Sequence, residues 1–210
     1  MGKIILYSLY ERFWHWTQAL AAVILLVTGF EISYSTHFSV TGFQFAVTLH
    51  NIVAVLFIIN AFLALFYNVT TGLLAQYIPR LKDLMPMGLQ HAHYYVFGIF
   101  RGEPHPFDKT PDRRLLPLQK ITYFGVLNFL LPFMIITGAL KFSAYYNPAL
   151  VESFGGLNVL GPLHRFGAWL FLSFLIVHVY MITTGRTLGH NMWTMITGYE
   201  TSEEAATEDK

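Results

Sequence analysis

Four long apolar segments constrain the fold of this chain more than any other feature. Each holds about 20 mostly apolar residues, which is the length a helix needs to cross the hydrocarbon core of a membrane. They lie at residues 13–34, 44–67, 119–141 and 162–184. Hydrophobic residues make up 54% of the chain and charged residues only 12%, which is not the composition of a soluble domain. We therefore predict an all-α fold, an integral membrane four-helix bundle formed by residues 1–200 as a single domain.

The basic residues predict how this bundle is oriented. The links at 35–43 and 142–161 contain no Lys or Arg, whereas the long link at 68–118 contains six. Because cytoplasmic loops carry an excess of Lys and Arg, we expect the long link and both termini on the cytoplasmic side. We expect membrane lipid around the bundle and no nucleic-acid partner. The net charge of +1 is by itself uninformative about nucleic acid.

Two other segments are expected to lie outside the spans. Part of the long link is apolar and aromatic, but Pro79 and Pro86 interrupt it, so it predicts an interfacial segment and not a fifth span. The tail at 201–210 is acidic and poor in apolar residues, and we expect it to be disordered.

The absence of cysteine narrows the redox chemistry. A chain with no Cys forms no disulfide, no Cys-ligated iron–sulfur cluster and no covalent haem attachment through C-x-x-C-H. Any haem in this chain is therefore b-type and held by side-chain ligands alone.

Histidines inside the apolar segments are the strongest functional signal. His164 and His178 lie fourteen residues apart in the last segment, which is close to four helical turns. Both imidazoles therefore project from nearly the same face, ~21 Å apart along the axis. An ionisable side chain inside a membrane helix marks a functional site by default. Two on one face suggest two stacked cofactors.

Each of these histidines has a partner at a matching depth. In the predicted topology, His15 in the first segment pairs with His178 near the inner surface, and His50 in the second pairs with His164 near the outer surface. Each pair can supply two axial ligands to one low-spin haem iron. The second nitrogen of each ring should reach a carbonyl, threonine or serine. The alternative is that these histidines are interhelical hydrogen-bond donors.

Three further features bear on the same sites. The first and third segments both end in Thr-Gly, at Thr28-Gly29 and Thr137-Gly138. Glycine at such a position lets a neighbouring helix or a flat macrocycle approach the backbone closely. The alternative is that these glycines serve ordinary helix packing. Arg165 follows His164 on the outer side, where topology does not call for a positive charge, and is a candidate partner for a haem propionate.

Several motifs together resemble a known family. They are RFWHW with TG thirteen residues after the histidine, LHN, PLQKITY, LHRFGAW with IVHVY, and MITGYE. Over residues 10–200 they are similar to the prokaryotic four-helix di-haem cytochrome b family. That family includes the cytochrome b subunits of Ni–Fe hydrogenases, formate dehydrogenase gamma subunits and thiosulfate-reductase-type membrane anchors.

The resemblance implies a membrane-anchoring subunit of a respiratory oxidoreductase in the prokaryotic cytoplasmic membrane. Its partners would be an iron–sulfur subunit, a catalytic subunit and a quinone, and its cofactors two b-type haems. It implies that His15 and His178 bind the cytoplasmic-side haem and that His50 and His164 bind the outer one. Quinone would bind near the start of the third segment. Leu116 stands there where relatives often have Asn, which leaves Gln119 and Lys120 as the matching positions.

Two other functions stay open from the sequence. One is a self-contained cytochrome b561-like oxidoreductase that acts between a small reductant or superoxide and quinone. The other is a haem-free membrane scaffold or small transporter. No cofactor role is predicted for the H-x-H pair of His91 and His93, because no further ligand set lies near them in the sequence.

Overall fold

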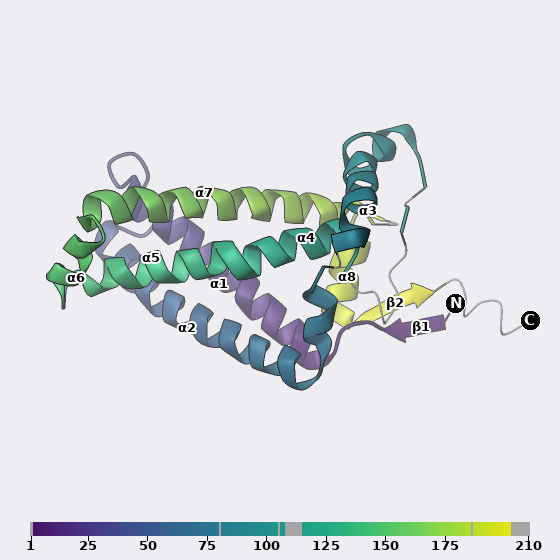
Figure 1. Cartoon of the computed structure of the whole chain (residues 1–210), viewed down its shortest axis with the longest axis horizontal. Coiled ribbons are helices and arrows are strands. Elements are labelled where there is room, and N and C mark those ends of the chain that lie inside the picture. Colours follow the sequence, from purple (N-terminus) through teal and green to yellow (C-terminus); the bar gives the residue numbers. More distant parts are fainter. Residues whose placement is uncertain (1, 80, 105, 108–114, 186, 203–210) are drawn as a thin grey trace, which may run out of the picture. The chain divides into compact units, whose positions relative to one another are not determined.

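The structure is a computed structural model that describes residues 2–79, 81–104, 106–107, 115–185 and 187–202. Its long elements are helices α1 (Leu9–Ser33), α2 (Phe43–Thr70) and α7 (Gly156–Thr183). A fourth run, Pro117–Ser143, combines α4 (Pro117–Gly125), the π-helical turn η4 (Val126–Leu130) and α5 (Leu131–Ser143). Figure 1 labels the α-helices of these runs.

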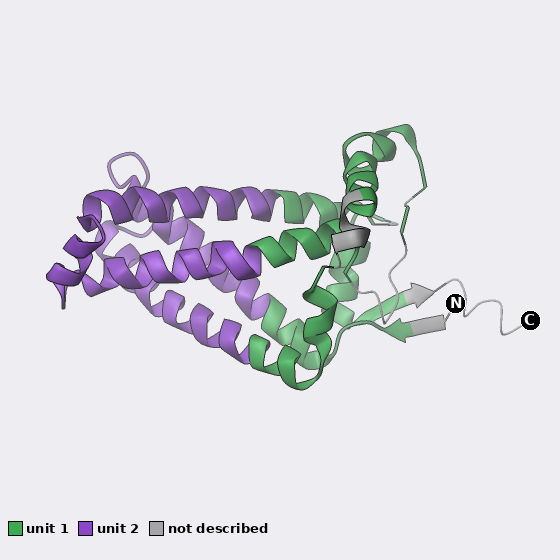
Figure 2. Cartoon of the chain, in the orientation of Figure 1, with its two compact units in different colours: residues 1–15, 65–125, 177–210 green, residues 16–64, 126–176 purple. Residues whose placement is uncertain are grey.

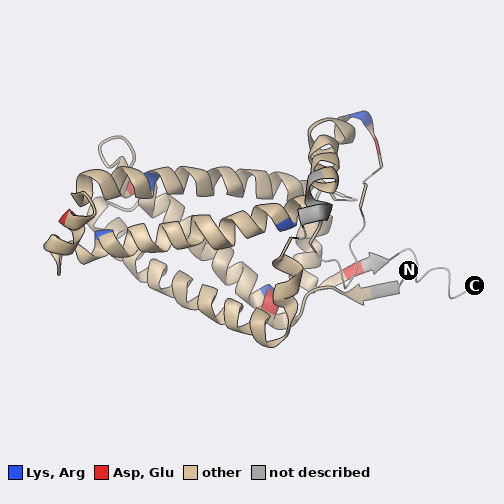
Figure 3. Ribbon diagram, in the orientation of Figure 1, with Lys and Arg blue, Asp and Glu red and all other residues tan. Residues whose placement is uncertain are grey.

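These four runs are long and apolar enough to cross a membrane. The predicted all-α membrane helical bundle with four spans is therefore confirmed. The positions of the termini relative to the two sides of the membrane stay a prediction. Many large apolar side chains are exposed, such as Phe62 at 64% and Ile176 at 62%, which suits a bundle whose solvent is hydrocarbon. Figure 3 shows how sparse charged residues are along the long helices.

Local sequence sets where the first span begins. The Ser8 hydroxyl accepts a hydrogen bond from the Glu11 N–H (3.2 Å), and the Glu11 carboxylate accepts one from the Ser8 N–H (2.7 Å). This reciprocal pair is a capping box, which satisfies backbone donors that a helix start leaves open. Helix α1 therefore begins at Leu9, four residues before the predicted start of the apolar segment.

The third span is irregular next to its proline. Pro132 is the second residue of α5, and the π-helical turn η4 directly precedes it. A proline has no N–H for the carbonyl one turn earlier, so the helix must adjust its hydrogen bonding at this point. The sequence analysis did not predict a π-helical turn.

The chain forms two compact units, each of which includes part of all four runs (Figure 2). Unit 1 consists of residues 1–15, 65–125 and 177–210, and unit 2 of residues 16–64 and 126–176. The core of unit 2 is formed by Ala21 and Ala22 of α1 packed with Val53 and Phe57 of α2. Small residues on α1 allow this close approach.

Unit 1 contains the segments outside the spans. The long link forms η1 (Leu73–Tyr77), α3 (Leu81–His93), the π-helical turn η2 (Tyr94–Gly98) and η3 (Ile99–Arg101). Helix α3, which includes Pro86, packs against α4. The Tyr180 hydroxyl donates to the Tyr95 carbonyl (2.9 Å), which ties α7 to η2. Burial raises the pKa of the Tyr95 phenol.

The two ends of the described chain pair with each other in unit 1. Strand β1 (Gly2–Ile5) runs antiparallel to β2 (Tyr199–Ser202), with Ile4 opposite Glu200. Helix α8 (His190–Thr197) leads into β2, and Glu200 contacts His190. Arg12 donates to the carbonyls of Ile196 and Thr197 at the end of α8. The first two residues of the predicted tail thus belong to β2, and its remaining residues, 203–210, lie outside the described chain.

A buried carboxylate organises the link between α1 and α2 in unit 2. Glu31 is fully buried, and its oxygens accept backbone N–H groups of Val40 (2.9 Å), Thr41 (2.8 Å) and Gly42 (2.7 Å). Gly42 has φ +92, a conformation that favours glycine, directly before α2 begins. Successive N–H groups that converge on an anion form a nest, which fixes the path of the link.

We expect Glu31→Gln to lower the melting temperature of the purified protein by several degrees. The amide replaces a charged acceptor with a neutral group and brings its own N–H donors toward the link's N–H donors. The matched control is Glu152→Gln, since this exposed residue of α6 (Pro148–Ser153) should leave the melting temperature within about one degree. Equal melting temperatures for Glu31→Gln and the parent would show that the nest contributes nothing.

Candidate functional site

Unit 2 brings together one pair of the predicted histidines. His50 lies two turns into α2 and His164 lies in α7, and their ring centroids are 6.4 Å apart with an interplanar angle of 77°. The structure therefore brings together two histidines that the sequence predicted as a pair. Their role as haem ligands stays a prediction.

The two Thr-Gly motifs hold these two rings in the same way. The Thr28 hydroxyl of α1 lies 2.9 Å from Nδ1 of His50, and the Thr137 hydroxyl of α5 lies 2.8 Å from Nδ1 of His164. Both threonines are buried. Each hydroxyl also donates to the carbonyl one turn earlier in its own helix, at 2.7 Å in both cases.

These contacts select a tautomer. A threonine hydroxyl has a single proton, which each of these hydroxyls gives to a carbonyl, so its oxygen accepts from the imidazole. Nδ1 of His50 and of His164 therefore carries the proton, and Nε2 keeps its lone pair. This is the state that a metal-binding histidine needs, with its second nitrogen held by a hydrogen bond. The expected threonine partner is thus found for both rings.

The glycines of the same motifs leave room for the rings. A Cβ added at Gly29 would lie 3.2 Å from Cε1 of His50, and one added at Gly138 would lie 3.2 Å from Cε1 of His164. Both distances are tighter than ordinary carbon contacts. The Thr-Gly motifs therefore act on the histidines directly, and helix packing alone does not explain them.

Unit 1 contains the other pair. His15 lies in the second turn of α1 and His178 near the end of α7, with ring centroids 6.3 Å apart and an interplanar angle of 49°. The Tyr123 hydroxyl of α4 lies 3.3 Å from Nδ1 of His178. The sequence analysis did not single out Tyr123, although it lies one turn after Gln119 in the PLQKITY motif.

The donor set fits haem better than a bare metal ion. Two imidazoles that each bond one metal ion at about 2.0 Å place their ring centres roughly 6 Å apart, close to both observed separations. Within the described residues, no group of three or more His, Asp or Glu side chains gathers as a metal site. A bare ion needs three or four protein ligands, whereas a haem supplies four nitrogens itself and needs only two axial ligands.

The remaining predicted site residues lie as follows. Arg165 is half-buried, with its guanidinium carbon 5.5 Å from the centre of the Tyr34 ring. The Gln119 carbonyl oxygen accepts the N–H of buried Leu116 (3.1 Å), so it caps the start of α4. Lys120 is half-buried in the same turn. The quinone role of Gln119 and Lys120 stays a prediction.

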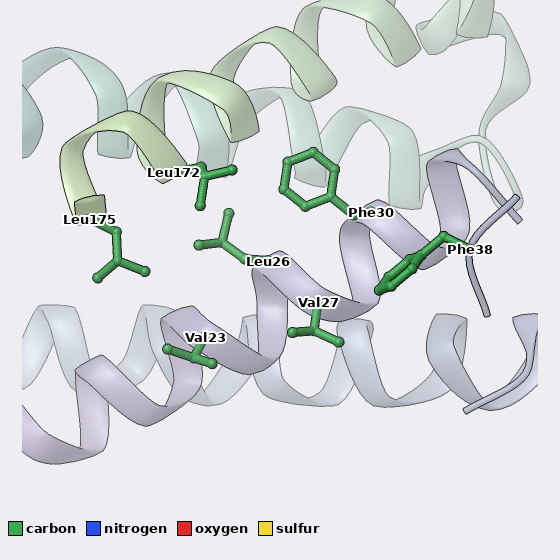
Figure 4. A pocket seen from close by; sticks show the side chains of 7 residues that line it. All are labelled: Val23, Leu26, Val27, Phe30, Phe38, Leu172 and Leu175. Carbon is green, nitrogen blue, oxygen red and sulfur yellow. The ribbon is translucent and has the colours of Figure 1, made fainter. Parts of the chain in front are cut away.

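Unit 2 also has an apolar pocket of about 230 Å³. Figure 4 shows its lining side chains, which come from α1, the following link and α7: Val23, Leu26, Val27, Phe30, Phe38, Leu172 and Leu175. None of them offers a hydrogen-bond donor or acceptor. The pocket can therefore accept an apolar chain but cannot by itself orient a polar ligand.

The chain resembles known proteins over most of its length. The family model described as prokaryotic cytochrome b561 matches residues 6–198. The protein named cytochrome YdhU of Escherichia coli (strain K12) is 32% identical over 198 residues, which cover 94% of this chain and 74% of that protein.

A second relative is named for its complex. The Ni/Fe-hydrogenase B-type cytochrome subunit of Cupriavidus necator (strain H16) is 29% identical over 219 residues, which cover 92% of this chain and 85% of that protein. The family match extends from the capping region of α1 to the end of α8. This chain belongs to the prokaryotic cytochrome b561 family and is a multi-pass membrane cytochrome of the b type, a class that works in electron transport.

Proposed function

We propose that this protein is the membrane-anchoring di-haem cytochrome b subunit of a respiratory oxidoreductase complex. It carries electrons across the cytoplasmic membrane between an iron–sulfur partner subunit and the quinone pool. The observation that carries this proposal is the pair of matched histidine sites, His15 with His178 and His50 with His164, at nearly equal ring separations. Two similar sites in one chain suit a two-step electron path.

His15 and His178 would hold one b-type haem, and His50 and His164 the other. When bound, haem supplies one-electron chemistry at its iron. Two imidazoles on each iron would leave no open position for oxygen, which would favour electron transfer over oxygen binding. Thr28 and Thr137 keep the outer rings oriented, and the apolar surroundings exclude water from them.

Helix α7 provides one ligand to each site. His164 and His178 are fourteen residues apart in this uninterrupted helix, which corresponds to ~21 Å of rise. With the basic long link at 68–118 on the cytoplasmic side, His178 belongs to the inner site and His164 to the outer one. Moving one charge across the membrane is worth about 2.3 kcal/mol per 100 mV. The direction of transfer then decides whether the complex builds or consumes membrane potential.

The quinone would react beside the inner site, at the start of α4. Gln119 and Lys120 lie in this turn, and Tyr123 of the same helix reaches His178 (3.3 Å). Helix α4 would therefore place polar side chains within one turn of a residue that contacts a proposed haem ligand. A catalytic complex as partner is supported by the relative named as a hydrogenase cytochrome subunit.

Affinity purification from gently solubilised membranes tests the anchoring role. The protein should co-purify with an iron–sulfur subunit and a catalytic subunit, and the complex should reduce or oxidise quinone. A chain that purifies alone and exchanges electrons between a small reductant and quinone would instead show the self-contained cytochrome b561-like function.

We expect Thr28→Val or Thr137→Val to weaken haem binding at the outer site by about 10–100-fold, because each variant removes the acceptor of a ligand's N–H. Haem titration of the apoprotein measures this loss. Thr48→Val is the matched control, since the Thr48 hydroxyl is exposed and donates only to a carbonyl of its own helix. Unchanged haem affinity in both Thr-Gly variants would contradict the role given to these hydroxyls.

A further inference from the structure

Unit 2 contains two basic side chains that no acidic side chain neutralises. Its charged residues are Glu31, Glu152, Lys141 and Arg165. Glu31 uses its oxygens on the link between α1 and α2, and Glu152 is exposed on α6. All residues of unit 2 are described, and within it no salt bridge joins either acid to Lys141 or Arg165.

Lys141 lies beside the outer histidine pair. It is half-buried in α5, one turn after Thr137 and Gly138, which contact the ring of His164. Lys141 therefore lies on the face of α5 that contacts the ring of His164.

Arg165 follows His164 directly in α7, and it contacts Tyr34. Its guanidinium lies over the ring of Tyr34, a cation–π arrangement. The Trp169 indole, one turn further along α7, donates to the Tyr34 hydroxyl (3.3 Å). The guanidinium N–H groups form no hydrogen bond within the described chain. This leaves a forked donor that suits a carboxylate.

Two half-buried cations of the same sign repel each other and lose solvation, which is costly unless an anion compensates. The missing anion must carry about two negative charges, reach two helices and lie next to His50 and His164. We propose that Lys141 and Arg165 together bind a dicarboxylate, the two propionate groups of the outer haem. This inference rests on the proposed function, since it requires a haem between His50 and His164.

The test uses full-length apoprotein in neutral detergent, carrying His15→Ala so that only the outer site remains. It is titrated with haem and with haem dimethyl ester, whose propionates are neutral. The parent should bind haem at least about tenfold more tightly than the ester. Lys141→Met and Arg165→Met should each lose about tenfold in affinity for haem and little for the ester, whereas Lys141→Arg should retain haem affinity.

The apoproteins provide a readout that does not depend on haem. Removing one of two unpaired cations relieves repulsion, so the Lys141→Met apoprotein should melt no lower than the parent apoprotein. If the Met variants lose equal affinity for haem and for the ester, the proposal is overturned. It is also overturned if the parent binds haem and the ester with equal affinity.

A lipid phosphate is the other source of an anion for these cations. If the Met variants differ from the parent only in vesicles that contain anionic lipid, and equally for haem and ester, the headgroup is the ligand and the proposal is wrong. Failure of the proposed function looks different. In that case His50→Ala would leave haem binding unchanged in the His15→Ala background, whatever happens at Lys141.

Discussion

Replacing His50 with alanine should remove one of two haems and leave the other in place. His50 and His164 face each other with ring centroids 6.4 Å apart, so the variant takes away one of the two ligands proposed for that site. His15→Ala should remove the other haem, since His15 faces His178 at 6.3 Å. Pyridine-haemochrome quantitation of each purified variant should give about half the haem of the parent.

The two variants must also differ from each other. Redox titration should show that each lacks a different one of the parent's two haem components. His37→Ala is the matched control, because His37 is exposed in the link after α1 and should leave both haems bound. Loss of the same component in both variants would disprove the pairing, and loss of neither would disprove axial ligation.

The second large effect is expected at Gly138. A Cβ there would already lie 3.2 Å from Cε1 of His164, and the branched side chain of Gly138→Val adds two more carbons against the ring. The imidazole must turn away from Thr137, which breaks its 2.8 Å contact and misaligns the ligand. We expect this variant to retain less than about a tenth of the outer haem after purification.

Gly161→Val serves as the control for Gly138→Val. Gly161 lies in α7, and a Cβ there would meet nothing within 4 Å. Both variants add a β-branched residue to a helix, and Gly161→Val also carries the strain of a residue before Pro162. A lower haem content in Gly138→Val than in Gly161→Val therefore reports on the ring contact. Haem retention by Gly138→Val equal to that of Gly161→Val would show that close approach to His164 is not needed.

Features with a regular spacing could be predicted from the sequence. The four spans follow from the length of the apolar segments. Helical periodicity puts His164 and His178 on one face of the last span. Their predicted depths in the membrane match those of His50 and His15, which predicts the two pairs. The Thr-Gly motifs were visible because they repeat, but the sequence allowed ordinary helix packing as an alternative. Only the contacts with Nδ1 and Cε1 show that they hold the rings.

Other features depend on contacts that carry no periodic signal. The pairing of β1 with β2 joins the two ends of the described chain. Glu31 is a charged residue within an apolar segment. Its role could not be predicted, because its partners are backbone N–H groups that converge only when the link folds. Lys141 and Arg165 lie on different helices, and only the folded bundle shows that Thr137 and Gly138, one turn before Lys141, contact the ring of His164. The capping box of Ser8 and Glu11, by contrast, was a readable local signal that the sequence analysis missed.

The number of haems per chain tests the account most directly. Haem measured by pyridine haemochrome is divided by protein measured by amino-acid analysis, for the purified parent protein. We predict two b-type haems per chain, one for each histidine pair. A ratio of one would contradict the two-site electron path, and a ratio of zero would contradict haem binding by these histidines altogether.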